Sequence, residues 1–454
     1  MKKTLTSSLL FLLSGFSVFA QSTPVKPAAK KTDLTKKVSK TLPANAVETK
    51  DIDNYWIAFD SIQSTKDISK QIDYINRLYI QKGTPGIAAF IKTRHYTDSL
   101  WVKNINKYPK FWASIRPATM KVKESAAELA KQVKRFKAVY PELKPATIYF
   151  TIGGLNTGGT VLDDKVLIGS EIVTGTPATD VSEFKDNWLK SVFANQIESN
   201  LVYLNLHEYV HTQQNGESEN VLSQAIREGA CDFIAELVMD KPISTNYLTY
   251  GRAHADSLCK AFKKEMYLSS YGNWFYNGGA AGEKADLGYY VGYEISKGYY
   301  QNAKNKKQAV KDLIGLNLSD ESASEKILKG SRYFPEGFDK AALIADYAKN
   351  QPYILSIAPF ENHAKDVDAG VKEIRITFSK PMSNGRSFDL SSLGRDHFPL
   401  GKVIGFENDN RTIVMAADLV PNKEYGFVVT NRGFKSKDGY VLKETNYEVV
   451  FKTK

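Results

Sequence analysis

The strongest constraint in this sequence is a five-residue motif, His207-Glu208-Tyr209-Val210-His211. In an α-helix, positions i and i+4 lie on one face a turn apart, so both imidazoles can bind the same metal ion. Glu208 lies beside them, where it can accept a proton from metal-bound water without being a ligand. The apolar residues 201–206 predict a buried helix that presents this face. Taken alone, the motif also fits two structural histidines on an amphipathic helix.

A catalytic zinc ion needs a third protein ligand and one open position. A third histidine at position 217 is one known solution, but this chain has Glu217 there. A carboxylate on a following helix is the other, and Glu228 and Asp232 are spaced i and i+4. We therefore predict that His207, His211 and Glu228 bind Zn²⁺. Asp232 is predicted to accept the ring N–H of a ligating histidine and so fix its orientation.

These motifs resemble gluzincin zinc metallopeptidases. Within them, the chain is most similar to predicted zinc-dependent proteases of exported bacterial proteins, which are distantly similar to gliding-motility-associated lipoproteins. The resemblance spans roughly residues 145–300. Its matching segments are 152–160, 207–214, 227–233 and 288–293. It implies a zincin-like catalytic domain and peptide-bond hydrolysis, with no particular substrate.

Two further roles follow for a peptidase of this kind. A strand before the active-site helix would bind extended substrate by β-addition, and residues 166–171 fit that place in the chain order. A donor for the developing oxyanion is also needed, and Tyr289 is the candidate, with Tyr290 and Tyr293 nearby. A packing role for each tyrosine remains the alternative.

The N-terminal fifty residues predict export. A basic start and a short apolar run typify a cleavable signal peptide over residues 1–20. Residues 21–50, which are basic and poor in large apolar side chains, predict a disordered linker. No cysteine follows the predicted cleavage point, so the residue needed for lipid attachment is missing. We expect a secreted or periplasmic monomer with no membrane span, and association with the cell surface stays open.

The net charge of +11 does not indicate a nucleic-acid partner. Segment 21–50 carries a net +5 and Lys2 and Lys3 add two, which leaves +4 for all later residues. A charge that small, spread over two domains, does not indicate the basic surface that binds a polyanion.

A change of period divides the rest of the chain. Helical patterns dominate residues 51–349, with breaks predicted at Pro85-Gly86 and Arg116-Pro117 and a small sheet near 146–173. Residues 350–454 alternate with period two between turn signals, which predicts an Ig-like β-sandwich resembling the bacterial Ig-like domains of exported and surface-layer proteins. The predicted fold class is α+β. Cys231 and Cys259 could be bridged or reduced.

The function that best fits these expectations is a secreted zinc-dependent peptidase acting on a peptide or protein, with Glu208 as general base. The sequence does not choose between endo- and exopeptidase action. A catalytically inactive, zinc-stabilised surface-binding protein is one alternative, and an amidase of cell-wall peptides is another.

Overall fold

The computed structural model describes residues 46–185, 187–194, 201–277 and 284–454. The predicted signal peptide and residues 21–45 of the predicted linker lie outside these ranges. The chain is α+β and divides into two compact units, Met1–Phe262 with Met266–Gly337, and Phe338–Lys454 with the short segment Lys263–Glu265. None of the helices in the described ranges has the length and apolar character needed to cross a membrane.

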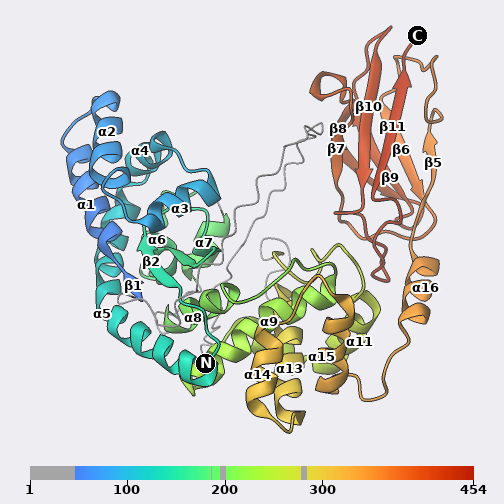
Figure 1. Cartoon of the computed structure of the whole chain (residues 1–454). Helices are drawn as coiled ribbons and strands as arrows, with labels where there is room; N and C mark the ends of the chain where they lie inside the picture. The colour runs from blue at the N-terminus through green and yellow to red at the C-terminus, as the bar shows by residue number, and fades with distance from the viewer. Residues whose placement is uncertain (1–45, 186, 195–200, 278–283) are drawn as a thin grey trace, which may run out of the picture. The chain divides into compact units, whose positions relative to one another are not determined.

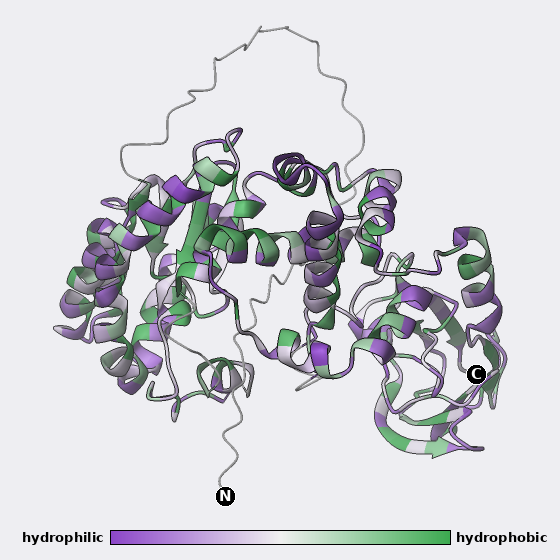
Figure 2. Cartoon of the chain, turned by 90° about the horizontal axis from the view of Figure 1, so that it is seen from below, coloured by the Kyte–Doolittle hydropathy of each residue, from purple (hydrophilic) through white to green (hydrophobic). Residues whose placement is uncertain are grey.

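The N-terminal unit is mainly helical (Figure 1). Its hydrophobic side chains are buried and its helices carry both hydrophobic and hydrophilic stretches, as amphipathic helices do (Figure 2). Its described helices are α1 (Lys50–Gln63), α2 (Ile68–Tyr74), the π-helix η1 (Ile75–Ile80), α3 (Pro85–Arg94), α4 (Asp98–Lys107), α5 (Pro109–Val139), α6 (Ser170–Val173), α7 (Asn187–Ala194), α8 (Leu201–His211), α9 (Val221–Met239), α10 (Asn246–Ala253), α11 (Ala255–Glu265), α13 (Leu287–Asn302), α14 (Lys306–Ile314) and α15 (Glu321–Ser331).

Two local predictions fail at the N-terminal side. Residues 47–50 were assigned to the linker, but they form strand β1 (Val47–Glu48) and the first residue of α1. Pro117 was expected to end a helix, yet it lies inside the long α5. The predicted break at Pro85 is confirmed, because that proline starts α3 at a position where its missing N–H costs nothing.

A four-stranded sheet supports the site, in the order β1-β2-β4-β3. Strand β2 (Thr147–Thr151) pairs parallel with β1 and with β4 (Lys165–Gly169), while β3 (Gly159–Leu162) pairs antiparallel with β4. The prediction that residues 166–171 form the edge strand is therefore wrong. β4 lies inside the sheet, residues 170 and 171 are helical, and β3 is the edge beside α8.

The loop from β2 to β3 is fixed by a buried carboxylate. Glu171 is fully buried and accepts hydrogen bonds from the backbone N–H groups of Gly153 (2.9 Å) and Leu155 (3.2 Å). Burial raises the pKa of Glu171 to about 7 against the opposing effect of these bonds. The glycine-rich loop 153–158 between β2 and β3 thus has a defined anchor.

Helices α9 and α13 approach one another closely because glycine faces glycine. A Cβ atom on Gly292 would lie 1.7 Å from the carbonyl oxygen of Ala225, and one on Gly229 would lie 1.9 Å from the carbonyl carbon of Gly292. Only backbones without side chains at these points can pack so tightly. This contact fixes the helix that carries Glu228 and Asp232.

The C-terminal unit is a β-sandwich preceded by helix α16 (Lys340–Asn350). One sheet has the order β11-β10-β7 and the other β5-β6-β9-β8, and neighbouring strands in both sheets pair antiparallel. Their inward side chains form one apolar core, in which Ile376, Phe427 and Val449 are fully buried. The predicted β-sandwich is confirmed. The strands are β5 (Ile354–Ala358), β6 (Glu373–Phe378), β7 (Phe388–Leu390), β8 (Leu400–Glu407), β9 (Thr412–Ala417), β10 (Glu424–Thr430) and β11 (Asn446–Lys452).

Replacing Gly292 by alanine should destabilise the N-terminal unit by about 3 kcal/mol, because the new methyl group meets backbone that cannot move cheaply. Denaturant unfolding measures this. The matched control is Gly272→Ala, where a Cβ would meet nothing within 4 Å. Equal stability of the two variants would contradict the close helix contact.

Glu171→Gln should change how stability depends on pH. The folded protein holds a proton on Glu171 up to about pH 7, whereas the unfolded chain releases it near the ordinary glutamate pKa of 4.5. The contribution of Glu171 therefore declines as the pH rises from about 4.5 to 7, by up to about 3 kcal/mol. Glutamine does not titrate, so the variant has no such pH-dependent loss of stability. Its free energy of unfolding, relative to that of the parent, should therefore rise between pH 5 and pH 8. A constant difference would show that Glu171 does not titrate there.

Candidate metal centre

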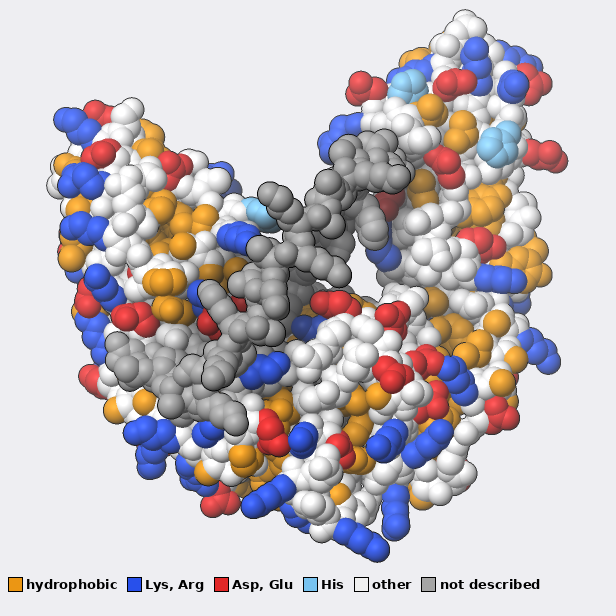
Figure 3. Space-filling view, in the orientation of Figure 1, with side chains coloured by type: hydrophobic (Ala, Val, Ile, Leu, Met, Phe, Trp, Pro, Cys, Tyr) orange, Lys and Arg blue, Asp and Glu red, His pale blue; other side chains and the backbone are white. Residues whose placement is uncertain are grey.

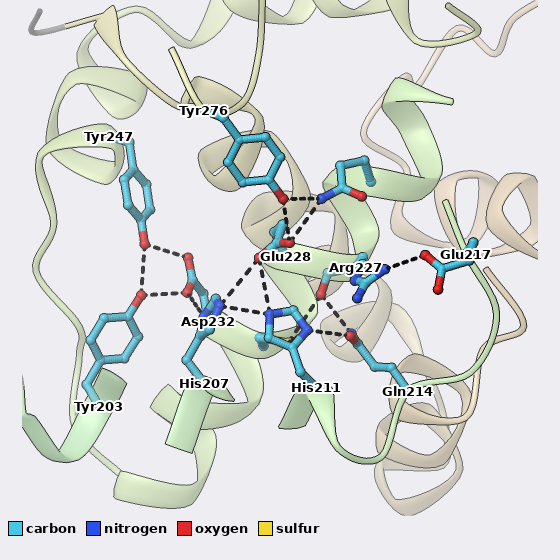
Figure 4. A network of polar contacts seen from close by, with 12 residues as sticks. Tyr203, His207, His211, Gln214, Glu217, Arg227, Glu228, Asp232, Tyr247 and Tyr276 are labelled. Atoms are coloured by element: carbon cyan, nitrogen blue, oxygen red, sulfur yellow. Dashed lines mark hydrogen bonds and ion pairs between the residues drawn. The ribbon is translucent and has the colours of Figure 1, made fainter. Parts of the chain in front are cut away.

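The predicted ligands lie on two adjacent helices. His207 and His211 occupy the last turns of α8, and Glu228 and Asp232 lie in the middle of α9. Asn220 caps α9 by accepting a bond from the Ser223 N–H, while the Ser223 hydroxyl accepts one from the Asn220 N–H. All four site side chains are buried. The two helices therefore present one enclosed polar cluster between them (Figure 4).

Three atoms converge at the centre of this cluster. The Nε2 atoms of His207 and His211 are 3.2 Å apart, and Oε2 of Glu228 lies 3.4 Å from the first and 3.3 Å from the second. Ligand atoms about 2.0–2.2 Å from a tetrahedral zinc ion lie about 3.3–3.6 Å from each other. The three edges of the observed triangle match that spacing, so the donor set fits a zinc ion.

Each imidazole is oriented by a partner on its other nitrogen. Nδ1 of His207 is 2.7 Å from Oδ1 of Asp232, and Nδ1 of His211 is 2.8 Å from Oε1 of Gln214. Gln214 is held in turn, because its amide donates to the carbonyl of Arg227 at 2.7 Å. With Nδ1 as the donor in both rings, each Nε2 presents its lone pair to the centre.

Two tyrosines surround Asp232. The hydroxyl of Tyr203 donates to Oδ1 at 2.5 Å and that of Tyr247 donates to Oδ2 at 2.8 Å, while the two hydroxyls are 2.8 Å apart. Figure 4 shows both rings on the side of Asp232 away from Glu228. These contacts hold the carboxylate in place, so that it can orient the imidazole of His207.

Glu228 has one occupied and one open oxygen. Its Oε1 accepts from Gln224 at 3.0 Å and from the Tyr276 hydroxyl at 3.3 Å, whereas Oε2 has no hydrogen-bond donor. Burial opposes its ionisation, yet the imidazoles of His211 and His207 hold the pKa of Glu228 well below its usual value. Burial lowers the pKa of His207, but Asp232 and Glu228 outweigh it and raise that pKa to about 10. The cluster therefore attracts a cation, either a proton or a metal ion.

Glu208 behaves differently from the ligands. It is 1% exposed, and neither of its carboxylate oxygens has a hydrogen-bond partner in the part of the chain that the structure describes. Leaving a carboxylate buried and unpaired is costly. Glu208 thus has two acceptor oxygens available to a group that is not part of the chain.

Cys231 offers a second set of ligand atoms. His207, His211 and Cys231 can place one atom each within 4.8 Å of one another. The Cys231 Sγ atom lies 3.4 Å from Nδ1 of His211, on the ring edge already occupied by Gln214, and donates to the carbonyl of Arg227. Glu228 meets both Nε2 atoms at shorter distances, so it is the better third ligand. Cys231 and Cys259 form no disulfide.

Tyr289 lies close to the centre but makes a ring contact there. Its ring stacks at 6.2 Å from that of His207 and 5.3 Å from that of Tyr247. Its role as oxyanion donor stays a prediction. Tyr293 instead donates to Glu236 and does not belong to the cluster.

The sequence did not single out several residues of this site. Tyr203 precedes His207 by one turn on the same helix face, so its helical spacing could have identified it from the sequence. Gln224 likewise precedes Glu228 by one turn on α9. Tyr247 and Tyr276 reach the cluster through tertiary packing, and no local pattern marks them.

The fold and the site define a two-unit α+β protein with a buried candidate metal centre and an Ig-like module. Residues 31–272, more than half of the chain, match the family of the gliding motility protein GldB, and the chain belongs to that family. Residues 348–453 match the bacterial Ig-like domain, as predicted. The assignment to gluzincin peptidases is wrong, because the matching family is GldB and not a peptidase family. A lipoprotein family of this kind indicates an exported protein associated with the cell envelope.

No curated protein matches the chain. Among solved structures, CopC from Methylosinus trichosporium OB3b is 18% identical, over 23% of this chain and 93% of that one, with a TM-score of 0.18. The S-layer protein rSbsC(31–844) is 15% identical over 71% and 45%, with a TM-score of 0.17. The N-terminal part of SbsC is 14% identical over 72% and 79%, with a TM-score of 0.18. TM-scores this low carry no inference about fold or function.

Tyr247→Phe should weaken zinc binding about tenfold, because Asp232 loses a donor and His207 is held less firmly. Competition with a chromogenic chelator measures the dissociation constant. Tyr250→Phe makes the same change on the same helix, where the ring stacks on His254 instead, and should leave zinc affinity unchanged. Equal affinities of the two variants would show that the tyrosine does not support the site.

Proposed function

We propose that this protein is an exported zinc-dependent hydrolase that cleaves peptide bonds, with the metal held by His207, His211 and Glu228. A bound zinc ion would act as a Lewis acid and supply an activated water. The N-terminal unit would then be a zincin-like catalytic domain. This function differs from the family assignment, since it rests on the chemistry of the residues.

Glu208 is the observation that carries the proposal. A purely structural zinc site is closed by four protein ligands and has no use for a further buried carboxylate. Glu208 follows the ligand candidate His207 in the chain and is buried, and neither of its oxygens has a partner among the described residues. As general base, it would take a proton from the attacking water and deliver it to the leaving amine nitrogen as the C–N bond breaks.

The edge strand β3 supplies a place for an extended peptide. Gly158 and Gly169 form a hydrogen-bonded pair, in which the N–H of Gly169 donates at 2.9 Å. Bonded and non-bonded pairs alternate in an antiparallel ladder, so Gly159 and Val161 direct their backbone groups away from β4. The carbonyl of Gly159 already accepts from the Thr157 hydroxyl at 2.8 Å, which leaves the backbone of Val161 for a substrate strand. A substrate strand added there would run beside α8, which packs against β3.

The second candidate is a catalytically inactive, zinc-stabilised binding protein of the cell surface. It is favoured by the family, which is named for gliding motility and not for hydrolysis. On this alternative the metal would only tie α8 to α9, and Glu208 would have no task.

Glu208→Gln separates the two functions. Parent and variant should each hold about one zinc ion, since Glu208 is not one of the converging donors. Cleavage of a mixed peptide library, followed by mass spectrometry, should fall at least about 100-fold in the variant. Glu217→Gln is the matched control, because that side chain is 91% exposed, and it should retain activity. Zinc bound without any cleavage by the parent would favour the binding protein, and absence of zinc from both would refute the metal centre.

A further inference from the structure

Arg94, the last residue of α3, is a half-buried cation with no carboxylate partner among the described residues. Its Nη2 donates weakly to Oγ1 of Thr157 at 3.3 Å and to the carbonyl of Gly159 at 3.4 Å. Its Nε is buried and has no acceptor. The planar edge formed by Nε and Nη2 is therefore incompletely satisfied, and it matches the two oxygens of a carboxylate.

The position of Arg94 relates it to the proposed catalytic residues. It contacts the first residue of the edge strand β3. Burial lowers the pKa of the guanidinium, while Glu208 lies near enough to act in the opposite direction. Arg94 is thus close to the candidate base and at the end of β3 where the strand begins.

Strand direction identifies which end of a substrate would meet this arginine. A peptide added antiparallel to β3 has its C-terminal end next to the beginning of the strand. Val161, whose backbone groups face the open edge, and Gly159 are two residues apart, about 7 Å. A peptide residue paired with Val161 would therefore be followed by only one or two residues before Arg94.

We propose that Arg94 binds the C-terminal carboxylate of a peptide substrate, so that the protein cleaves near peptide C-termini. This inference rests on the proposed function and narrows it from peptide hydrolysis in general to carboxypeptidase action. Arg94 is a specificity residue in this scheme, and hydrolysis itself still depends on Glu208.

Binding to the zinc-loaded full chain carrying Glu208→Gln tests the proposal without turnover. The probes are an N-acetylated pentapeptide pool with a free C-terminal acid, the same pool as the amide, and an amide pool ending in Glu. Calorimetry should show the free acid binding at least tenfold more tightly than either amide. Arg94→Gln should abolish this preference and Arg94→Lys should retain part of it. Arg77→Gln, at an exposed arginine paired with Asp73, should leave it intact.

Several outcomes would overturn the proposal. One is that the free-acid pool binds no more tightly than either amide pool, including the amide pool ending in Glu, or does not bind detectably. Another is that the Arg94→Gln variant keeps the full preference for the free acid while its melting temperature is unchanged. Cleavage assays with the parent keep the two claims apart. Internal cuts in both pools would leave the peptidase function standing and refute the role of Arg94. Tighter binding of the free acid without any cleavage would leave the role of Arg94 standing and refute the peptidase function.

Discussion

The buried polar contact between α8 and α9 is the interaction on which the rest of the site depends. Two imidazoles and two carboxylates share an enclosed space, and each needs a partner because none has access to bulk water. Asp232 and Gln214 satisfy the outer nitrogens, so the inner nitrogens and Oε2 of Glu228 are directed at one point. The close packing of α9 on α13 through Gly229 and Gly292 then keeps that point in place.

Much of the candidate site could be predicted, because helical spacing is a local property. The i, i+4 pairs at 207 and 211 and at 228 and 232 lie together on adjacent helices as expected. Tyr247 and the guanidinium near Glu208 could not be predicted, since they come from α10 and α3 through tertiary packing, whereas Tyr203 lies one turn before His207 on α8. A motif of five residues is too short to identify a family, whereas the match to the GldB family extends over residues 31–272.

Prediction of the fold from the sequence succeeded where side-chain periodicity determines the structure, and it failed where the order of strands in a sheet determines it. Alternation revealed the C-terminal sandwich, and the helical pattern revealed most of the N-terminal unit. The order of strands in the small sheet is not written in any one strand. The apolar run at 166–171 therefore predicts an edge strand, although β4, which contains most of it, lies between β2 and β3. Pro117 shows a similar limit, because the packing of the long α5 tolerates a residue that local propensity disfavours.

The contrast between Asp232 and Glu208 bears on the function of the site. Both carboxylates are buried, Glu208 on α8 and Asp232 on the adjacent α9, yet among the described residues Asp232 has three donors and Glu208 has none. A chain that provides a donor for every contact of Asp232 could have provided one for Glu208 by the same means. A carboxylate left without partners has a free-energy cost that the surrounding helices must offset. That cost is understandable if the missing partner is the water and substrate of a reaction, and it has no explanation if the metal only joins two helices.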